Sequence, residues 1–496
     1  MSSSSSISSP EHNIMNTICN NNIENSSKYS EFIFFGCWNN INCKSEYIYR
    51  DIVLDYISNN EKDIKQLYIA GDNWYTNKKK INDNEYKLYI PDILRTGYDK
   101  LYRMNKEIYI AVGNHDVDRD NDKDELKKDC SINTQKYYLK KIKEAANGMI
   151  DIPTLEDLKM IQNTELNEEK LCEKGVYIYV DNIGVRYNKN NIVIIINTNI
   201  FDNLEEGNKY LKKIKSVIKQ VIKAQAIKGS SSGSTCSKQI FVMGHIPLFT
   251  YKKDDISIHD INKEDYRYRI LIVDLFDILL ENNIIYLCAD THNFSIMKIK
   301  HNDKTLIQIT AGTGGADPDL IKGDFSLKPY KKDIENYSIE AYALNPYGYV
   351  SINIEDIYDA KYIDVCYTQV IIDKNDLRNK EKSIMKLRPS SAPLINIDNR
   401  YNKLAIPNAS ASISTSRIIK NKINKLTYRI TITKDTTTVK HFSIKYDTFE
   451  NNIKYHNKSI CNKIKSSNPD GSIKNAKGDI YCYKKLVKKD KKKSTM

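Results

Sequence analysis

The sequence contains no stretch that predicts a membrane-spanning helix. Across its 496 residues, no run of about 18 or more uncharged apolar residues occurs. Its start, MSSSSSISSPEHNIMNTICNNN, also lacks the basic residues and apolar core of a secretory signal. Residues 1–30 are rich in Ser and Asn and too polar to offset the entropy lost on ordering. We therefore expect residues 1–30 to form a disordered tail. We also expect the protein to be intracellular and not secreted, either in the cytoplasm or in a particle assembled there.

Paired cysteines are also missing, although the chain has ten cysteines. They lie singly along the sequence, and no two form a CxxC pair. Neither a zinc ribbon nor a disulfide framework is therefore indicated. We expect most of these cysteines to be small buried hydrophobic residues.

Acidic residues are scarce in the C-terminal quarter. The chain has a formal net charge of +13, but residues 373–496 alone contain 29 Lys and Arg against 10 Asp and Glu. Residues 1–372 carry a net charge of −6. The Lys-rich tail at 484–496, KKLVKKDKKKSTM, is typical of segments that bind polyanions non-specifically by counterion release. A solvated tail that keeps the protein soluble is the alternative.

Between residues 31 and 372, short apolar runs alternate with amphipathic segments. This alternation is typical of a layered α/β fold. Helical spacing of apolar residues predicts helices over 47–57, 210–227 and 266–280. The predicted strands lie at 32–35, 67–70, 108–112, 192–196, 240–243, 284–288 and 306–310.

Other segments interrupt or follow this α/β region. Residues 117–170 are highly charged, and we expect an insertion there, while GSSSGST at 229–235 predicts a flexible loop. We interpret residues 373–425 as a linker. KLTYRITITKDTTTVKHFSIKYD then alternates apolar and polar residues around a polar turn. This pattern predicts a β-hairpin in a small region over 426–483.

Polar side chains follow four of the predicted strands. They lie in GDNWY, GNHD, GHIP and ADTHNF, each directly after an apolar run. Because the carboxyl ends of strands in an open α/β sheet converge on one crevice, we expect these side chains to meet. Asp, Asn and His suit zinc, iron or manganese. The residues are Asp72, Tyr75, Asn114, His115, Asp116, His245, Asp290 and His292.

Each of these clusters has an ordinary structural explanation when taken singly. A Gly-Asp pair after a strand is more often a turn than a ligand, and a lone histidine such as that of GHIP is more often structural. However, the chain has only eight histidines, and His115, His245 and His292 all lie in the clusters. Coincidence explains this distribution poorly, so we favour a metal site.

In this order along the chain, GD, GNHD, GH and a histidine-containing turn resemble the calcineurin-like metallophosphoesterase superfamily. GDNWY, with its tyrosine three residues after the aspartate, is similar to the purple acid phosphatase branch. KYLKKIK at 209–215, TAGTGGAD at 310–317 and PYGYVSINI at 346–354 add to the resemblance. The resemblance covers residues 31–372 and implies a four-layer α/β/β/α sandwich with mixed sheets. Residues 373–496 remain outside it as a basic extension.

The resemblance also implies a site for two metal ions, Fe, Zn or Mn, held about 3.5–4 Å apart by a bridging carboxylate. His115 would lie beside the leaving group as a proton donor or phosphate-orienting residue. A metal-bound hydroxide, available near neutral pH, would attack phosphorus in line. The implied ligands are Asp72 for both ions, Tyr75 and His292 for the first, and Asn114 and His245 for the second.

Two ligand positions depart from the family pattern. Cys37 stands where the family has an aspartate after the strand-ending glycine, and Asp290 stands where the first histidine of GHxH is usual. Asp290 is a normal ligand type for zinc, iron or manganese. A thiolate at Cys37 could also bind a metal, but it mismatches iron(III) and manganese and favours zinc. Asn197, in INTN, replaces an aspartate that is not a direct ligand in the family.

We therefore predict a metal-dependent phosphoric ester hydrolase, an acid-phosphatase-like phosphomonoesterase acting on a phosphorylated substrate. Cys37 and Asp290 leave a second hypothesis open, in which a catalytically degenerate fold serves as a structural or binding module. A phosphodiesterase acting on nucleotides or nucleic acid is a third possibility that no motif selects. Cys37 decides whether the site holds two metals, one or none.

Overall fold

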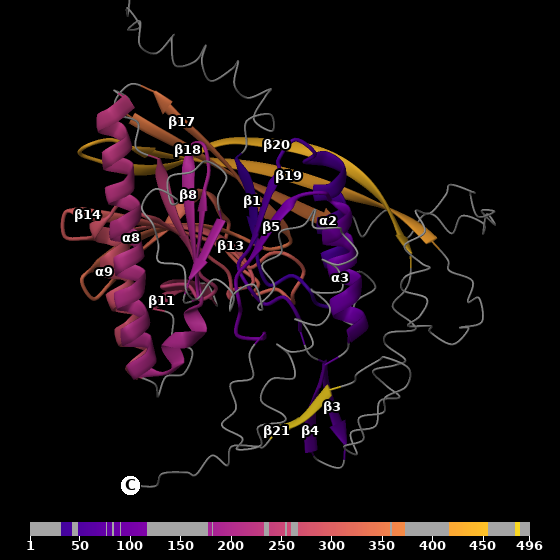
Figure 1. Ribbon diagram of the computed structural model, residues 1–496. Coiled ribbons are helices and arrows are strands. Elements are labelled where there is room, and N and C mark those ends of the chain that lie inside the picture. The colour runs from indigo at the N-terminus through magenta and orange to yellow at the C-terminus, as the bar shows by residue number, and fades with distance from the viewer. Residues whose placement is uncertain are drawn as a thin grey trace, which may run out of the picture.

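The described part of the chain is a mixed α/β structure in which two large sheets dominate. In the computed structural model, helices lie on two opposite sides of these sheets (Figure 1). The predicted tail at 1–30, the insertion at 117–170 and most of the Lys-rich tail lie outside the described residues. The structure describes residues 31–41, 48–75, 77–81, 84–89, 91–116, 177–180, 182–232, 238–252, 255–258, 266–357, 360–372, 416–454 and 482–486.

The first large sheet has seven strands and joins the N-terminal strands to the C-terminal hairpin. Three strands near one edge run parallel, and the other pairings are antiparallel, so the sheet is mixed. In spatial order its strands are β20 (Thr437–Lys454), β19 (Ser416–Ile432), β18 (Ala360–Ile372), β17 (Gly348–Ile357), β1 (Phe32–Phe35), β2 (Gln66–Ile69) and β5 (Glu107–Ile110).

The second large sheet has nine strands and is also mixed. Its central strands β14, β12, β9 and β8 run parallel. Their apolar runs are buried on both faces, as parallel strands commonly are. In spatial order the strands are β15 (Phe325–Ile334), β16 (Tyr337–Leu344), β13 (Phe294–His301), β14 (Lys304–Ala311), β12 (Ile285–Cys288), β9 (Gln239–Met243), β8 (Asn191–Ile196), β7 (Ile183–Tyr187) and β6 (Tyr177–Val180).

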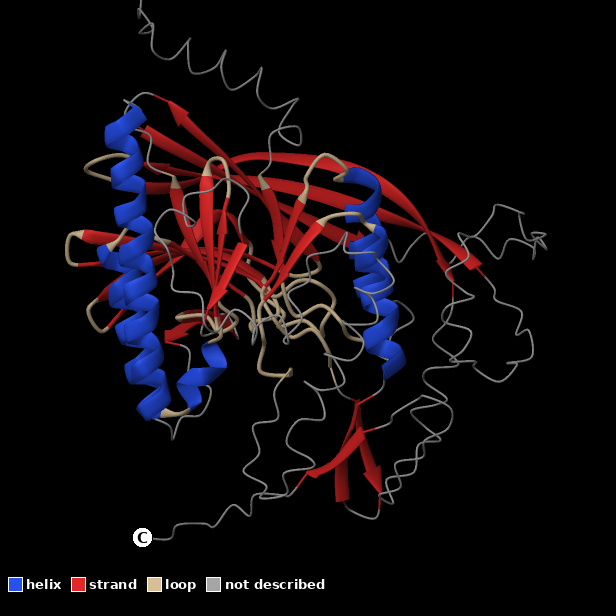
Figure 2. Cartoon of the chain, viewed as in Figure 1, coloured by secondary structure: helices blue, strands red, loops and turns tan. Residues whose placement is uncertain are grey.

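Two small sheets complete the described strands, which Figure 2 shows in red. One is the antiparallel pair β10 (Phe249–Lys252) and β11 (Asp255–Ile258), which follows β9 directly. The other joins β21 (Cys482–Leu486), β4 (Asn84–Tyr89) and β3 (Asn77–Ile81).

Three hydrophobic clusters fill the spaces between helices and sheets. The first joins helices α8 (Leu204–Ser232) and α9 (Tyr266–Glu281) to the nine-stranded sheet. The second joins α2 (Tyr49–Asn60) and α3 (Pro91–Arg103) to the seven-stranded sheet. The third lies between the two sheets. A short 3-10 helix, η2 (Thr198–Asp202), follows β8.

Strand β1 illustrates why the sheets are buried on both faces. Successive side chains of a strand point to opposite faces. Phe32 and Phe34 accordingly join the cluster between the sheets, while Ile33 and Phe35 join the cluster under α2 and α3. All four side chains are fully buried, so this apolar run has no polar face.

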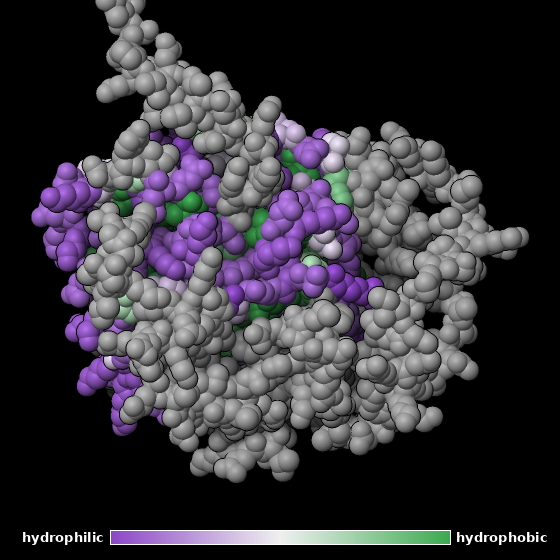
Figure 3. Space-filling model, turned by 45° about the horizontal axis from the view of Figure 1, so that its top comes forward, coloured by the Kyte–Doolittle hydropathy of each residue, from purple (hydrophilic) through white to green (hydrophobic). Residues whose placement is uncertain are grey.

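The described residues that are visible on one face of the molecule are mainly polar (Figure 3). Figure 3 shows hydrophilic residues over most of the coloured area of one face, with smaller hydrophobic areas between them. Few large apolar side chains are strongly exposed, and Leu320, Leu327 and Tyr446 are the most prominent among the described residues. No helix within these residues is long and apolar enough to cross a membrane.

The predicted elements agree with the structure near the site and differ toward the C-terminus. Each of the seven predicted strands is present and begins within two residues of its expected start. The loop predicted at 229–235 begins too early, because α8 continues to Ser232. The linker predicted over 373–425 ends too late, because β19 begins at Ser416.

The C-terminal hairpin also does not form a region of its own, as predicted for 426–483, but joins the main sheet. β19 pairs with β18 over residues 421–432 and so extends the seven-stranded sheet. Its residues Ile423, Leu426 and Tyr428 are buried in the clusters that hold the rest of the sheet. The hairpin therefore shares its hydrophobic core with residues 31–372. Within the predicted Lys-rich tail, residues 484–486 belong to β21, which pairs with β4.

Candidate metal centre

Five strand ends bring the candidate residues to one place. Strands β1, β2 and β5 of the seven-stranded sheet and β9 and β12 of the nine-stranded sheet each run into a short loop that carries one or two of them. β1, β2 and β5 run parallel to one another, as do β9 and β12, so within each sheet the carboxyl ends lie together. The residues are Cys37 after β1, Asp72 and Tyr75 after β2, Asn114 and His115 after β5, His245 after β9, and Asp290 and His292 after β12.

Three of these loops hold a candidate residue in the left-handed backbone region. The φ angles are 49° at Cys37, 54° at Asp72 and 53° at Asp290. Aspartate tolerates this conformation better than most residues, whereas cysteine is uncommon there. Backbone hydrogen bonds fix the loop at Cys37, whose N–H donates to the Gly71 carbonyl at 3.1 Å. Such locally strained residues cluster at functional sites.

Glycines allow the aspartate loop to approach its neighbours closely. A Cβ atom on Gly113 would lie 2.1 Å from the backbone nitrogen of Asp72 and 2.3 Å from its Oδ1. Gly71 has a φ of 87°, and a Cβ there would lie 2.7 Å from Nδ1 of His245. The glycines of GDNWY and GNHD are therefore required by the packing of these loops.

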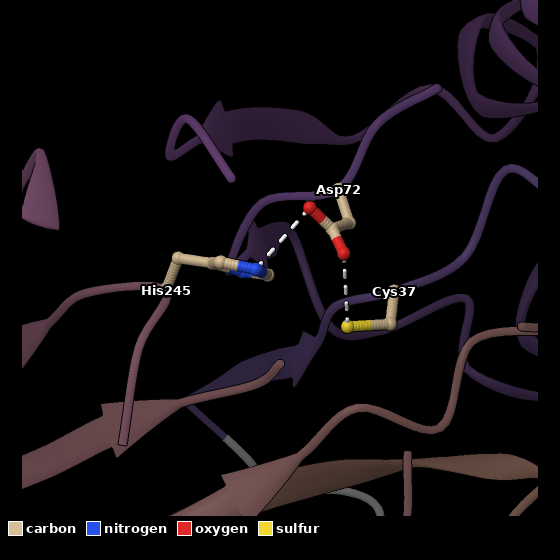
Figure 4. A group of neighbouring side chains, drawn as sticks. All are labelled: Cys37, Asp72 and His245. Atoms are coloured by element: carbon tan, nitrogen blue, oxygen red, sulfur yellow. Dashed lines mark hydrogen bonds and ion pairs between the residues drawn. The ribbon is translucent and has the colours of Figure 1, made fainter. Parts of the chain in front are cut away.

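The centre of the site is a buried triad of possible metal ligands, Cys37, Asp72 and His245 (Figure 4). Their ligand atoms all lie within 4.8 Å of one another. Oδ2 of Asp72 is 3.7 Å from the Cys37 sulfur, and its Oδ1 is 3.2 Å from Nε2 of His245. All three residues are at most 1% exposed. A thiol, a carboxylate and an imidazole together form a donor set that suits zinc.

The surroundings of His245 fit a cation. Its Nδ1 lies 2.6 Å from the Ala70 carbonyl, which can only accept a hydrogen bond, so Nδ1 carries a proton. Its Nε2 then faces three oxygens: Oδ1 of Asn114 at 2.9 Å, of Asp72 at 3.2 Å and of Asp290 at 3.6 Å. In a neutral ring the lone pair of Nε2 would point at these oxygens and be repelled by them. Either a second proton on the ring or a bound cation resolves the repulsion.

The pKa of His245 reflects these opposing effects. Burial alone would lower the pKa, but the negative charges of Asp72 and Asp290 and the hydrogen bonds to them outweigh burial and raise it to about 10. For Asp72 burial alone would raise the pKa, yet the positive charges of His245 and His115 hold it below its usual value. Without a metal, the site therefore pairs an imidazolium with a carboxylate.

A second group of donors faces the other oxygen of Asp72. The Tyr75 hydroxyl lies 2.8 Å from Oδ2 of Asp72 and 3.1 Å from Nε2 of His292. Nδ1 of His292 is 2.5 Å from the Asp317 carbonyl, so it carries a proton and leaves Nε2 to face the tyrosine. The two oxygens of Asp72 thus face different donor groups. Cys37, Tyr75 and His292 lie toward Oδ2, and Asn114 and His245 lie toward Oδ1.

His115 lies at the edge of this group, and the residue is exposed, but desolvation by the surrounding protein lowers the pKa of its imidazole. Its ring centroid is 4.6 Å from that of Tyr75, and its backbone N–H donates to Oδ1 of Asp72 at 2.9 Å. The backbone of His115 thus orients the carboxylate while its ring remains accessible. Asn197 takes no part in the cluster, because its side chain accepts a hydrogen bond from the Asn199 N–H and caps η2.

Asp116 and Asn73 join the loops around the site. The Asp116 carboxylate accepts hydrogen bonds from the backbone N–H of Gly113 at 2.7 Å and from both the backbone and side-chain N–H groups of Asn73. Oδ1 of the Asn73 side chain accepts a hydrogen bond from the Trp38 indole N–H at 3.1 Å. The sequence places Asp116 among the candidate ligands, but in the structure it holds the β1, β2 and β5 loops together. Asn73 was not singled out, although it lies inside GDNWY.

Two further charged residues lie at the site, and no sequence motif marks either of them. Lys252, at the end of β10, places its ammonium 3.9 Å from Oδ2 of Asp290 and 3.6 Å from Oδ2 of Asp319. Oδ2 of Asp319 also accepts the backbone N–H of His292 at 2.9 Å. Lys252 lies seven residues after His245 and Asp319 lies beyond TAGTGGAD, so only their spatial proximity links them to the ligands.

No family model and no curated protein matches this chain. Among solved structures, the chain is similar to the structure of PhoD, with 11% sequence identity over 84% of this chain and 71% of that chain. The TM-score is 0.36. A similarity of this extent assigns neither an activity nor a substrate.

Proposed function

We propose that this chain is a metal-dependent phosphoric ester hydrolase, an acid-phosphatase-like phosphomonoesterase built on the α/β/β/α sandwich of the metallophosphoesterases. The observation that carries the proposal is the carboxylate of Asp72, which lies between two groups of donor atoms at the ends of five strands. A carboxylate placed between two groups of donors is suited to hold two metal ions close together. The three hydrophobic clusters support the layered arrangement.

The residues divide into two sets that suit two ions. Both sets combine nitrogen and oxygen donors, and Cys37 adds a sulfur that favours zinc over iron(III) or manganese. When bound, the ions would supply charge stabilisation at the phosphoryl oxygens and an activated water. The first set is Cys37, Tyr75, His292 and Oδ2 of Asp72, and the second is Asn114, His245, Asp290 and Oδ1 of Asp72.

The chain's own residues would hold the substrate and move protons. His115 has an exposed ring beside Tyr75, where it can donate a proton to the leaving-group oxygen. Its position is fixed by two hydrogen bonds. Its own backbone N–H donates to Asp72, and within the GNHD turn the Gly113 N–H donates to the Asp116 carboxylate.

The scaffold hypothesis also has an observation in its favour. In the absence of a metal, the buried charges form a satisfied network, with His245 paired to Asp72 and the Tyr75 hydroxyl donating to the same carboxylate. A degenerate site could persist in this form as a structural core. Metal content distinguishes this hypothesis from the enzymatic one.

The test is hydrolysis of p-nitrophenyl phosphate by the purified full chain after exposure to Zn, Mn, Fe or Mg. We expect metal-dependent hydrolysis, which Asp72→Asn abolishes and His115→Ala lowers by about 100-fold or more. Asp303→Asn is the matched control, because Asp303 is an exposed carboxylate in the turn between β13 and β14. No hydrolysis with any of these metals, together with less than one bound metal per chain, would favour the scaffold.

A further inference from the structure

Lys252 lies in a segment that is fixed beside the site. The buried side chain of Gln308 holds the start of β10, because its Oε1 accepts hydrogen bonds from the backbone N–H groups of Leu248 and Phe249 at 2.9 and 3.1 Å. Buried Asn293, one residue after His292, donates to the Tyr251 carbonyl at 2.8 Å. The backbone next to Lys252 is thereby tied to the loop that carries Asp290 and His292.

The ammonium of Lys252 lies between two carboxylates without binding either closely. It is 3.9 Å from Asp290 and 3.6 Å from Asp319, and both distances exceed those of a normal hydrogen bond. The side chain is 40% exposed. An exposed ion pair of this length is weak, so the ammonium can turn toward a bound anion at little cost.

Asp290 connects this ammonium to the candidate metal site. One oxygen of Asp290 faces Nε2 of His245 at 3.6 Å, and the other faces Lys252. If Asp290 binds a metal, its charge is shared with that ion, and the attraction holding Lys252 on the carboxylate decreases. The ammonium then lies one carboxylate away from the ion, on the partly exposed side of the site.

We propose that Lys252 binds a non-bridging phosphoryl oxygen of the substrate and favours phosphomonoesters over phosphodiesters. Lysine binds phosphate as a point charge with three donors. A monoester carries close to two negative charges at neutral pH and a diester only one, so the monoester gains more from an added cation. The inference rests on the proposed phosphatase activity and adds a substrate preference to it.

Binding of inorganic phosphate to the zinc-loaded full chain, measured by titration calorimetry, tests the proposal without requiring turnover. We expect Lys252→Met to weaken phosphate binding about tenfold or more, and Lys252→Arg to retain most of it. Lys300→Met is the control, because Lys300 is an exposed lysine on β13. Zinc content should be equal in all four proteins. In turnover assays, Lys252→Met should raise KM for p-nitrophenyl phosphate more than for bis(p-nitrophenyl) phosphate.

Three outcomes would overturn the inference in distinguishable ways. Unchanged phosphate binding in Lys252→Met would show that Lys252 does not contact phosphate, and would leave the proposed function standing. Loss of zinc from Lys252→Met would show that the lysine acts only through Asp290. A wild-type chain that holds zinc but binds no phosphate would overturn the proposed function and this inference together.

Discussion

The backbone conformation of Cys37 is unusual for cysteine, whereas its side chain lies where a metal ligand would be expected. Its φ of 49° is one that Asp, Asn and Gly adopt more readily than cysteine. Its sulfur, however, lies within the buried triad with Asp72 and His245. Burial raises the pKa of the Cys37 thiol well above its usual value, and the charges of Asp72 and Asp290 raise it further. A bound cation would reverse this effect and favour the thiolate.

We expect Cys37→Asp to fold and to change the metal preference of the site. The aspartate suits the backbone and replaces a soft donor with a hard one, so zinc affinity should fall by about tenfold or more while manganese binding improves. Cobalt-substituted wild-type protein should show a near-ultraviolet sulfur-to-cobalt charge-transfer band that the variant lacks. Cys366→Ser, which changes a free cysteine of β18 that is not part of the triad, should keep the band. Absence of the band in the wild type would remove Cys37 from the ligand set.

At the scale of elements, the C-terminal hairpin is held to helix α2 by a largely buried charge. Glu61, just beyond the end of α2, is 4% exposed and accepts the hydroxyl of Tyr349 at 2.5 Å. Lys425 of β19 lies 3.4 Å from the same oxygen. The ammonium that contacts this carboxylate therefore comes from Lys425, the last residue of the predicted linker. This contact adds to the pairing of β19 with β18.

Removing the countercharge should destabilise the whole chain. Lys425→Met leaves Glu61 with the tyrosine hydrogen bond and with Lys106, which binds its backbone carbonyl, but removes the ammonium that contacts its carboxylate. We expect a loss of about 1–3 kcal/mol in the free energy of unfolding. Lys440→Met, at an exposed position of β20, should change it by less than about 0.5 kcal/mol. Urea denaturation measures both variants. Equal stabilities for the two would mean that the hairpin does not depend on this ion pair.

At the scale of the whole molecule, metal binding and folding should be coupled. The candidate ligands come from loops in both large sheets, so they are together only in the folded chain. A ligand that binds only the folded state stabilises it by about 2.7 kcal/mol at a free concentration 100 times its Kd. Zinc should therefore raise the Tm, and a chelator should lower it again.

The stabilisation by zinc should increase with pH. With a metal-free pKa of about 10, His245 is almost fully protonated between pH 6 and 8 and must release that proton to bind a metal. Each proton released raises the affinity about tenfold per pH unit, so the Tm increase caused by a fixed zinc concentration should be larger at pH 8 than at pH 6. Asp72→Asn should lose most of the increase. An increase of equal size at both pH values would contradict proton release by His245.

Much of the central fold could be predicted because its signals are local. An apolar run such as 32–35 or 240–243 must be buried, and the glycine after it ends the strand, so strand positions and the polar residues beyond them can be read directly. The ability of Asp72, Asn114, His245 and the other candidates to bind a metal ion could be predicted from their residue types. Their separation into two groups around Asp72 could not be read from spacing, because it depends on how the two sheets pack.

The sequence by itself therefore determined seven of the strands, their succession along the chain and the types of donor that follow them, since these depend on neighbouring residues. Only the tertiary structure decided that β19 extends the main sheet, that Asp116 ties loops together, and that Lys252 lies against Asp290. These contacts join residues far apart in the chain through strand pairing and hydrophobic packing. Nothing in the local pattern around Lys252 or Ser416 specifies the partner, which is chosen by the free energy of the whole fold.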